Sequence, residues 1–163
     1  MSLDQIGHAD RAAFYRTSLF LGLVRGDAVV RWADRTLAHN SDVLPAFIEI
    51  ATIPAEDLTA LRLALLGLCN EQESARVIGA VFGLINRHLV SGQRSAVDTI
   101  TVLMQARRSM RLEPALSDEL RQIELAFWRS ERTGDTGSLE ARLHTWLGHY
   151  RGTEERFLDE AGS

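Results

Sequence analysis

The sequence predicts an all-α fold, a compact single-domain array or bundle of about eight helices with short connections. Apolar residues recur at helical spacing almost throughout, and no stretch alternates polar and apolar residues for long enough to form an amphipathic strand. The short joints between the helical stretches favour antiparallel neighbours. A chain of 163 residues fits one domain, residues 1–163, because a domain of this size buries roughly 68 to 70% of its unfolded surface.

Four helices are expected in the first half of the chain. The first two span about residues 10–24 and 28–39. A short third helix follows Pro45, whose missing amide proton does no harm in a first turn. The fourth spans Pro54 to Cys69 and carries a wide leucine stripe, which predicts a central and largely buried helix. Four leucines form the stripe, Leu58, Leu61, Leu65 and Leu68, and Leu63 and Leu66 lie beside it and widen it.

A fifth helix is expected to end near Val90, and Asn70 and Glu73 at its start have the spacing of a capping box. Within it, Ala75, Gly79 and Gly83 recur every four residues and form a smooth ridge that another helix can approach closely. The ridge favours internal packing, with a dimer face as the alternative. Three more helices are expected over about residues 94–108, 117–132 and 139–150, followed by an acidic tail, residues 152–163, that frays or docks through Phe157 and Leu158.

The tripeptide Arg25-Gly26-Asp27 is explained by the joint between the first two helices. Glycine tolerates the left-handed conformation that ends one helix, and aspartate accepts hydrogen bonds from the first amides of the next. On the wheel of the second helix, Trp32 lies at the edge of the core and Asp34 on its rim. Two interpretations of Asp34 stay open, pairing inside the fold and contact with a ligand.

The first third of the chain resembles small uncharacterised bacterial all-α proteins that have a Val-x-Trp-Ala-Asp helix. The residues that carry this resemblance are Gly22-Leu23-Val24, Val30, Trp32-Ala33-Asp34 and Ile48-Glu49-Ile50-Ala51. The resemblance implies a bacterial, all-α protein. It implies no activity and no catalytic residue.

Composition excludes several kinds of chemistry. All 18 basic residues are arginine, so a phosphate-binding loop that ends in Gly-Lys-Ser or Gly-Lys-Thr and Schiff-base catalysis are excluded. Cys69 is the single cysteine, so we expect a buried and inert thiol. No histidine follows a glutamate by three residues, and Glu140 and His144 are expected to form an exposed pair. Paired acids are interpreted as helix caps: Glu56-Asp57, Glu71/Glu73 and Asp118-Glu119.

The middle of the chain is basic. Residues 81–112 hold five arginines and one acid, a charge of +4 between acidic flanks. There, an inward stripe of Val97, Ile100 and Met104 on the sixth helix continues into three arginines, Arg107, Arg108 and Arg111. One interpretation pairs these arginines internally with acids such as Glu119 or Glu124. The other is an anion pocket formed by the three arginines, with Trp32 and Asp34 as further candidates for ligand contact.

The leading functional hypothesis is a non-enzymatic protein–protein interaction module of adaptor, regulator or immunity type. The alternative is a domain that binds an anion or small molecule through the arginine cluster. An enzyme of undescribed type stays possible, and we expect no cofactor, no metal and no catalytic residue. The partner is expected to be a protein or a second copy of the chain, since a pI near 5.7 disfavours nucleic acid.

The same sequence predicts no association with a membrane. The longest stretch without a charged residue, Val77 to Asn86, is far shorter than the roughly 20 apolar residues that a membrane span needs. Met1-Ser2-Leu3-Asp4 lacks the order of a secretory signal, so we expect a cytoplasmic protein.

Overall fold

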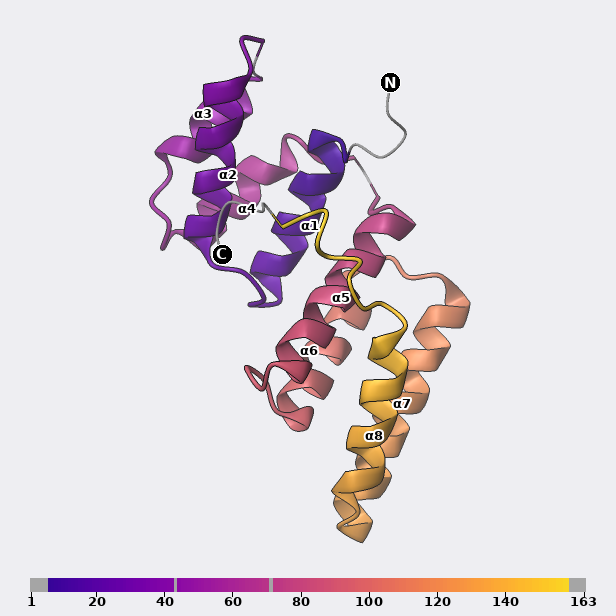
Figure 1. Cartoon of the computed structure of the whole chain (residues 1–163). Helices are drawn as coiled ribbons and strands as arrows, with labels where there is room; N and C mark the ends of the chain where they lie inside the picture. The colour runs from indigo at the N-terminus through magenta and orange to yellow at the C-terminus, as the bar shows by residue number, and fades with distance from the viewer. Residues whose placement is uncertain (1–5, 43, 71, 159–163) are drawn as a thin grey trace. The chain divides into compact units, whose positions relative to one another are not determined.

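The computed structural model describes residues 6–42, 44–70 and 72–158, and these residues form eight helices and no strand (Figure 1). The prediction of an all-α fold is therefore confirmed. The helices are α1 (His8–Phe20), α2 (Gly26–His39), α3 (Pro45–Thr52), α4 (Leu58–Leu66), α5 (Ala75–Val90), α6 (Ala96–Ser109), α7 (Pro114–Thr133) and α8 (Thr136–Gly148). None of these helices is both long and apolar enough to cross a membrane. Some residues used in predictions lie outside the described ranges: Met1-Ser2-Leu3-Asp4, Glu71, Asp159 and Glu160.

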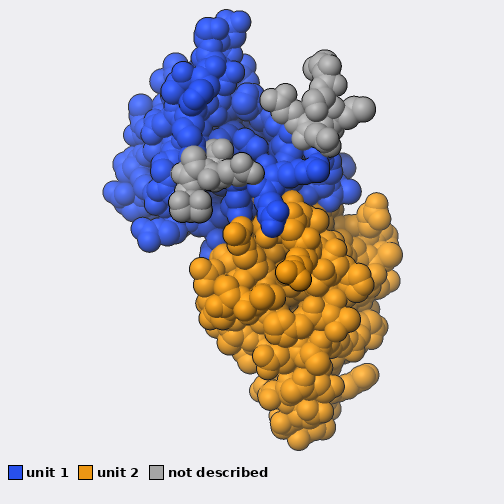
Figure 2. Space-filling model, viewed as in Figure 1, with its two compact units in different colours: residues 1–77, 155–163 blue, residues 78–154 orange. Residues whose placement is uncertain are grey.

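The chain divides into two compact units (Figure 2). Unit 1 comprises residues 1–77 and 155–163, and unit 2 comprises residues 78–154. Each unit has its own set of packed helices, α1 to α4 in unit 1 and α6 to α8 in unit 2. The organisation of residues 1–163 as one domain stays a prediction.

Aromatic rings build the core of unit 1. Trp32 is 1% exposed, and its ring centroid lies 5.3 Å from that of Tyr15 and 5.1 Å from that of Phe47. The acidic tail of the chain docks in this unit through Phe157, whose ring lies 5.1 Å from the ring of Phe14. Of the two predicted fates of the tail, docking is confirmed for residues 155–158.

The joint between α1 and α2 differs from the prediction. The left-handed residue after α1 is Gly22, with φ 69°, whereas Gly26 is the first residue of α2 and has no positive φ. Gly26 is required for space instead, because a Cβ there would overlap the carbonyl oxygen of Ala55 and lie 2.9 Å from Leu61 Cδ1. Asp27 sits in the first turn and accepts a hydrogen bond of 2.8 Å from Arg31.

The prediction of a largely buried fourth helix is wrong. The helix begins only at Leu58, because Asp57 caps it by accepting a hydrogen bond of 3.0 Å from the Ala60 amide. Leucines spaced four and three residues apart face inward, as expected for one side of a helix. These are Leu61, Leu65 and Leu68, whereas Leu58, Leu63 and Leu66 are 43%, 71% and 48% exposed. A helix this short has one covered side, so its remaining leucines face solvent.

The start of α5 is capped by Ser74, not by Asn70. The Ser74 hydroxyl accepts a hydrogen bond of 3.3 Å from the amide of Val77. Glu73 instead accepts a hydrogen bond of 3.5 Å from the Thr17 hydroxyl of α1. The predicted capping box is therefore wrong, because a hydroxyl next to the first helical residue reaches the free amides directly.

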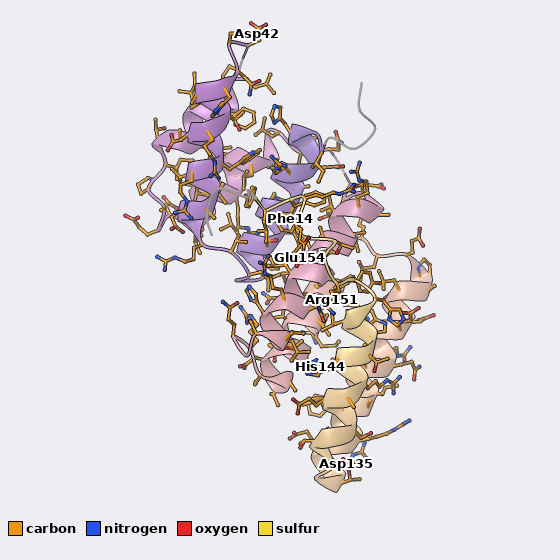
Figure 3. The ribbon with its side chains drawn as sticks, viewed as in Figure 1. Phe14, Asp42, Asp135, His144, Arg151 and Glu154 are labelled. Atoms are coloured by element: carbon orange, nitrogen blue, oxygen red, sulfur yellow. The ribbon has the colours of Figure 1, made fainter. Side chains whose placement is uncertain are left out.

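Two residues of the small-residue ridge of α5, Gly79 and Gly83, pack internally in unit 2, as predicted, whereas Ala75 is exposed and belongs to unit 1. The Thr153 hydroxyl donates a hydrogen bond of 2.8 Å to the carbonyl of Gly79. A Cβ on Gly83 would lie 2.7 Å from the carbonyl oxygen of Tyr150 and 2.6 Å from a carboxylate oxygen of Glu154 (labelled in Figure 3). The segment that occupies the ridge is thus the turn after α8, residues 150–154, and not another helix.

Candidate functional site

Helix α7 carries apolar side chains on two sides. Leu120 and Ile123 are buried and face the other helices of unit 2. Leu125 and Trp128 are 40% and 55% exposed. At 100° per residue they lie roughly opposite the buried pair, so their exposure is a property of the helix face and not of a frayed end.

Trp128 is weakly attached to its own unit. Among the described residues, its one ring contact is with its neighbour Phe127, edge to face with centroids 5.2 Å apart. A tryptophan buries about 150 to 250 Å² when it is covered, so an indole left in solvent is a large apolar surface. Neither the hydrogen bonds nor the packing of unit 2 explains this position.

Arginines flank this apolar pair. Arg121 precedes Leu125 by one helical turn, Arg129 follows it by one turn, and Arg132 follows Trp128 by one turn. All three are exposed, and within the described residues none forms an ion pair. One acid, Asp118, lies on the same side of the helix, three residues before Arg121 and seven before Leu125, and another, Glu131, lies beyond the edge of this surface on the side of Trp128. We refer to five residues as the α7 outer face: Arg121, Leu125, Trp128, Arg129 and Arg132.

A groove of about 480 Å³ runs along the other flank of α7, where it packs against α8. Its central contact is a hydrogen bond of 2.7 Å from the Trp146 indole nitrogen to Glu119 Oε2. Trp146 also makes an edge contact with Phe82 and a tilted ring contact with Tyr150, each with centroids 5.4 Å apart. The groove is lined by Glu119, Gln122, Ile123, Ala141, Arg142, Thr145, Trp146 and His149.

Glu119 also affects the pKa of a nearby residue, Tyr150. Burial raises the pKa of Tyr150, and the nearby carboxylate of Glu119 raises it further. The sequence predicted Glu119 as a helix cap or as a partner of an arginine. Because α7 begins earlier than predicted, at Pro114, Glu119 is beyond the first turn and serves Trp146 instead. The predicted exposed pair is present on the same hairpin, with His144 Nε2 3.9 Å from Glu140 Oε1 (Figure 3).

The predicted arginine cluster is divided between pairing and exposure. Arg107 Nη1 lies 3.0 Å from Glu124 Oε2, and Arg107 Nε donates a hydrogen bond of 3.4 Å to Ser117. Internal pairing with Glu124 is therefore confirmed for this arginine. Arg108 and Arg111 are exposed and form no ion pair with any described residue.

The stripe that leads to this cluster was predicted with one error. Ile100 and Met104 are buried, but Val97 is 49% exposed. The buried residues of α6 also include Thr99, Val102, Leu103 and Ala106. Because these buried residues define the side of α6 that faces the core, Val97 lies on the solvent side.

The two remaining candidates belong to unit 1. Trp32 is sealed in the aromatic core, so its ring offers no surface to a ligand. Asp34 is exposed and has no hydrogen bond or ion pair with any described residue, so both interpretations of this carboxylate stay predictions. The arginine cluster belongs to unit 2.

The chemistry of other reactive groups is limited. In the described ranges, no group of three or more His, Cys, Asp and Glu residues is arranged to hold a metal ion. Cys69 is half-buried, and its thiol donates a hydrogen bond of 3.2 Å to the Leu65 carbonyl. Burial raises the pKa of this thiol to about 11, with Arg16 opposing the shift and Glu73 adding to it. The thiol is therefore protonated and weakly nucleophilic.

No family model, curated protein or solved structure matches this chain. The resemblance to bacterial Val-x-Trp-Ala-Asp proteins stays a prediction, and the site must be judged from its geometry alone. Sequence reasoning predicted a helix over about residues 117–132 and overlooked Trp128. The signal was present, because Trp128 follows Leu125 by three residues on the side of the helix away from Leu120 and Ile123.

Proposed function

We propose that the chain is a protein–protein interaction module without enzymatic activity of its own, and that it binds its partner through the α7 outer face. The observation that carries this proposal is Trp128, 55% exposed on a helix that buries its other side. Tryptophan and arginine are the residue types most enriched among the side chains that dominate binding energy at interfaces. The α7 outer face combines both.

The chemistry of this face defines the partner. An apolar pocket on the partner would take the indole of Trp128, and Leu125 would pack beside it. Three arginines around this pair would meet aspartates or glutamates, with bidentate pairing where the geometry allows. An adaptor, a regulator and an immunity protein all work through such contacts, so the process that it serves follows from the partner's identity.

The alternative, an anion-binding domain built on the arginine cluster, has less support. Arg107 is neutralised by Glu124, which leaves Arg108 and Arg111 as the available cations. Two exposed arginines hold an anion weakly, because water competes for the same hydrogen bonds.

Crosslinking tests the proposal. A photoreactive phenylalanine derivative replaces Trp128 in the full chain, which is expressed in its native cell, and the same residue replaces Leu63 as the matched control. Leu63 is 71% exposed on α4 and lies outside the α7 outer face. We expect an adduct of one defined mass at position 128 and none of that mass at position 63. An adduct of two copies of the chain would identify the partner as a second copy.

Binding measurements with the captured partner complete the test. Trp128→Ala should weaken the Kd by at least about 30-fold, the effect of a side chain worth 2 kcal/mol or more. Leu63→Ala should change the Kd by less than about twofold. Equal adducts at the two positions, or a Kd that Trp128→Ala leaves unchanged, would refute the proposal.

A further inference from the structure

A small cavity in unit 1 lies between α1 and the segment that follows α4. Its volume is about 210 Å³, below the roughly 300 to 1,000 Å³ of sites for drug-sized ligands. The cavity therefore suits a ligand of a few heavy atoms. It is lined by Ala13, Arg16, Leu66, Cys69, Asn70 and Glu73.

Two opposite charges face this cavity without pairing with each other. Arg16 is half-buried and forms no hydrogen bond or ion pair with any described residue. Glu73 is also half-buried, and one of its oxygens, Oε1, accepts a hydrogen bond of 3.5 Å from Thr17. The guanidinium group and the second carboxylate oxygen therefore have unused hydrogen-bonding capacity at one small site.

Among the described residues, the rest of the lining is apolar or neutral. Ala13 is 8% exposed, and Leu66 contributes an aliphatic side chain from the end of α4. Asn70 adds an amide, which both donates and accepts hydrogen bonds. Cys69 is protonated and already donates to the Leu65 carbonyl, so it adds a weakly polar wall and no charge.

We propose that this cavity binds a small zwitterion, a free α-amino acid with a short apolar side chain. Its carboxylate pairs with the Arg16 guanidinium, which presents two parallel N–H donors to such a group. Its ammonium group pairs with Glu73, and its side chain packs against Ala13 and Leu66. A simple anion would leave Glu73 half-buried without a counter-charge. A simple cation would leave Arg16 half-buried without a counter-charge. Both cases cost free energy.

Cys69 supplies a reporter for this site, because it is the single cysteine of the chain and lines the cavity. The rate of its alkylation by iodoacetamide is measured at one mildly alkaline pH, with and without L-alanine, L-valine or L-leucine at millimolar concentration. A ligand at ten times its Kd leaves about a tenth of the sites empty, so the rate should fall about tenfold. The amide of the protecting amino acid lacks the carboxylate and its α-hydroxy analogue lacks the ammonium group, so neither should slow the reaction.

Two variants test whether Arg16 and Glu73 are the charged groups that hold the ligand. Arg16→Gln and Glu73→Gln should each abolish the protection of Cys69. Each variant is scored as the ratio of its alkylation rates with and without ligand, because this ratio cancels any effect of the substitution on the reactivity of the thiol itself. Arg25→Gln and Glu56→Gln, which replace exposed residues of the same unit, should keep it. Isothermal titration with the same amino acids gives a second measurement.

Three outcomes would overturn the proposal. The first is an alkylation rate that no amino acid changes, together with no heat of binding. The second is equal protection by the amide or the hydroxy acid. The third is binding in the titration without protection of Cys69, which would place the ligand at another site. None of these outcomes bears on the α7 outer face, which belongs to unit 2.

Discussion

Trp32 and Trp128 show how differently the two units use the same residue. Trp32 is 1% exposed and closes the aromatic core of unit 1, whereas Trp128 is 55% exposed on unit 2. The charges differ as well. Unit 1 has eight arginines and thirteen acids, a net charge of −5, and unit 2 has ten arginines and nine acids, a net charge of +1. In unit 1 the indole of Trp32 stabilises the core, whereas in unit 2 the indole of Trp128 lies among arginines and is accessible from solvent.

Trp32→Ala should have the largest effect on stability. Removal of a fully buried tryptophan loses its apolar burial and leaves a cavity between Tyr15 and Phe47, at a cost of about 3 to 5 kcal/mol. Trp128→Ala is the matched control and should change the free energy of unfolding by less than about 0.5 kcal/mol. Urea unfolding followed by circular dichroism measures both. Similar losses in the two variants would remove the contrast between the units.

Gly26→Ala should have the next largest effect, because it tests the closeness of packing in unit 1. The added methyl group meets the backbone carbonyl of Ala55, which cannot rotate away, so we expect a loss of about 1 to 3 kcal/mol. Gly7→Ala is the matched control, since a Cβ there meets nothing within 4 Å, and the poorer N-cap that alanine provides costs only about 0.5 to 1 kcal/mol. A Gly26→Ala variant as stable as the parent would show that this joint is loosely packed.

Sequence periodicity predicted most of the fold because each helix buries one side. It placed Leu61 and Leu65 inward and Pro45 in a first turn, and both are confirmed. It also placed Leu63 and Val97 inward, and both are exposed. Periodicity defines a direction around a helix, but whether a neighbouring segment is long enough to cover that direction depends on tertiary packing.

The candidate sites were less predictable for the same reason. The pair of Arg107 and Glu124 could be predicted, because a basic helix end next to an acidic helix favours it. The cavity of unit 1 could not, since its described lining combines residues 13 and 16 of α1 with residues 66, 69, 70 and 73. These residues lie where α4 ends, at Leu66, and before α5 begins, at Ala75, and both boundaries differ from the prediction.

Asp27 should give the smallest effect, a pH dependence confined to unit 1. Its hydrogen bond with Arg31 lowers its pKa, and the charges of Arg31 and Arg25 lower it further, while burial opposes the shift. A carboxylate whose pKa is lowered in the folded state stabilises the protein above its ordinary pKa, and this contribution is lost as the pH falls through the lowered value. Because the side chain is 39% exposed, the contribution should be only about 0.3 kcal/mol. Asp27→Asn should remove this step from the stability profile between neutral and acidic pH, and a profile that the substitution leaves unchanged would show that the pair with Arg31 adds nothing to unit 1.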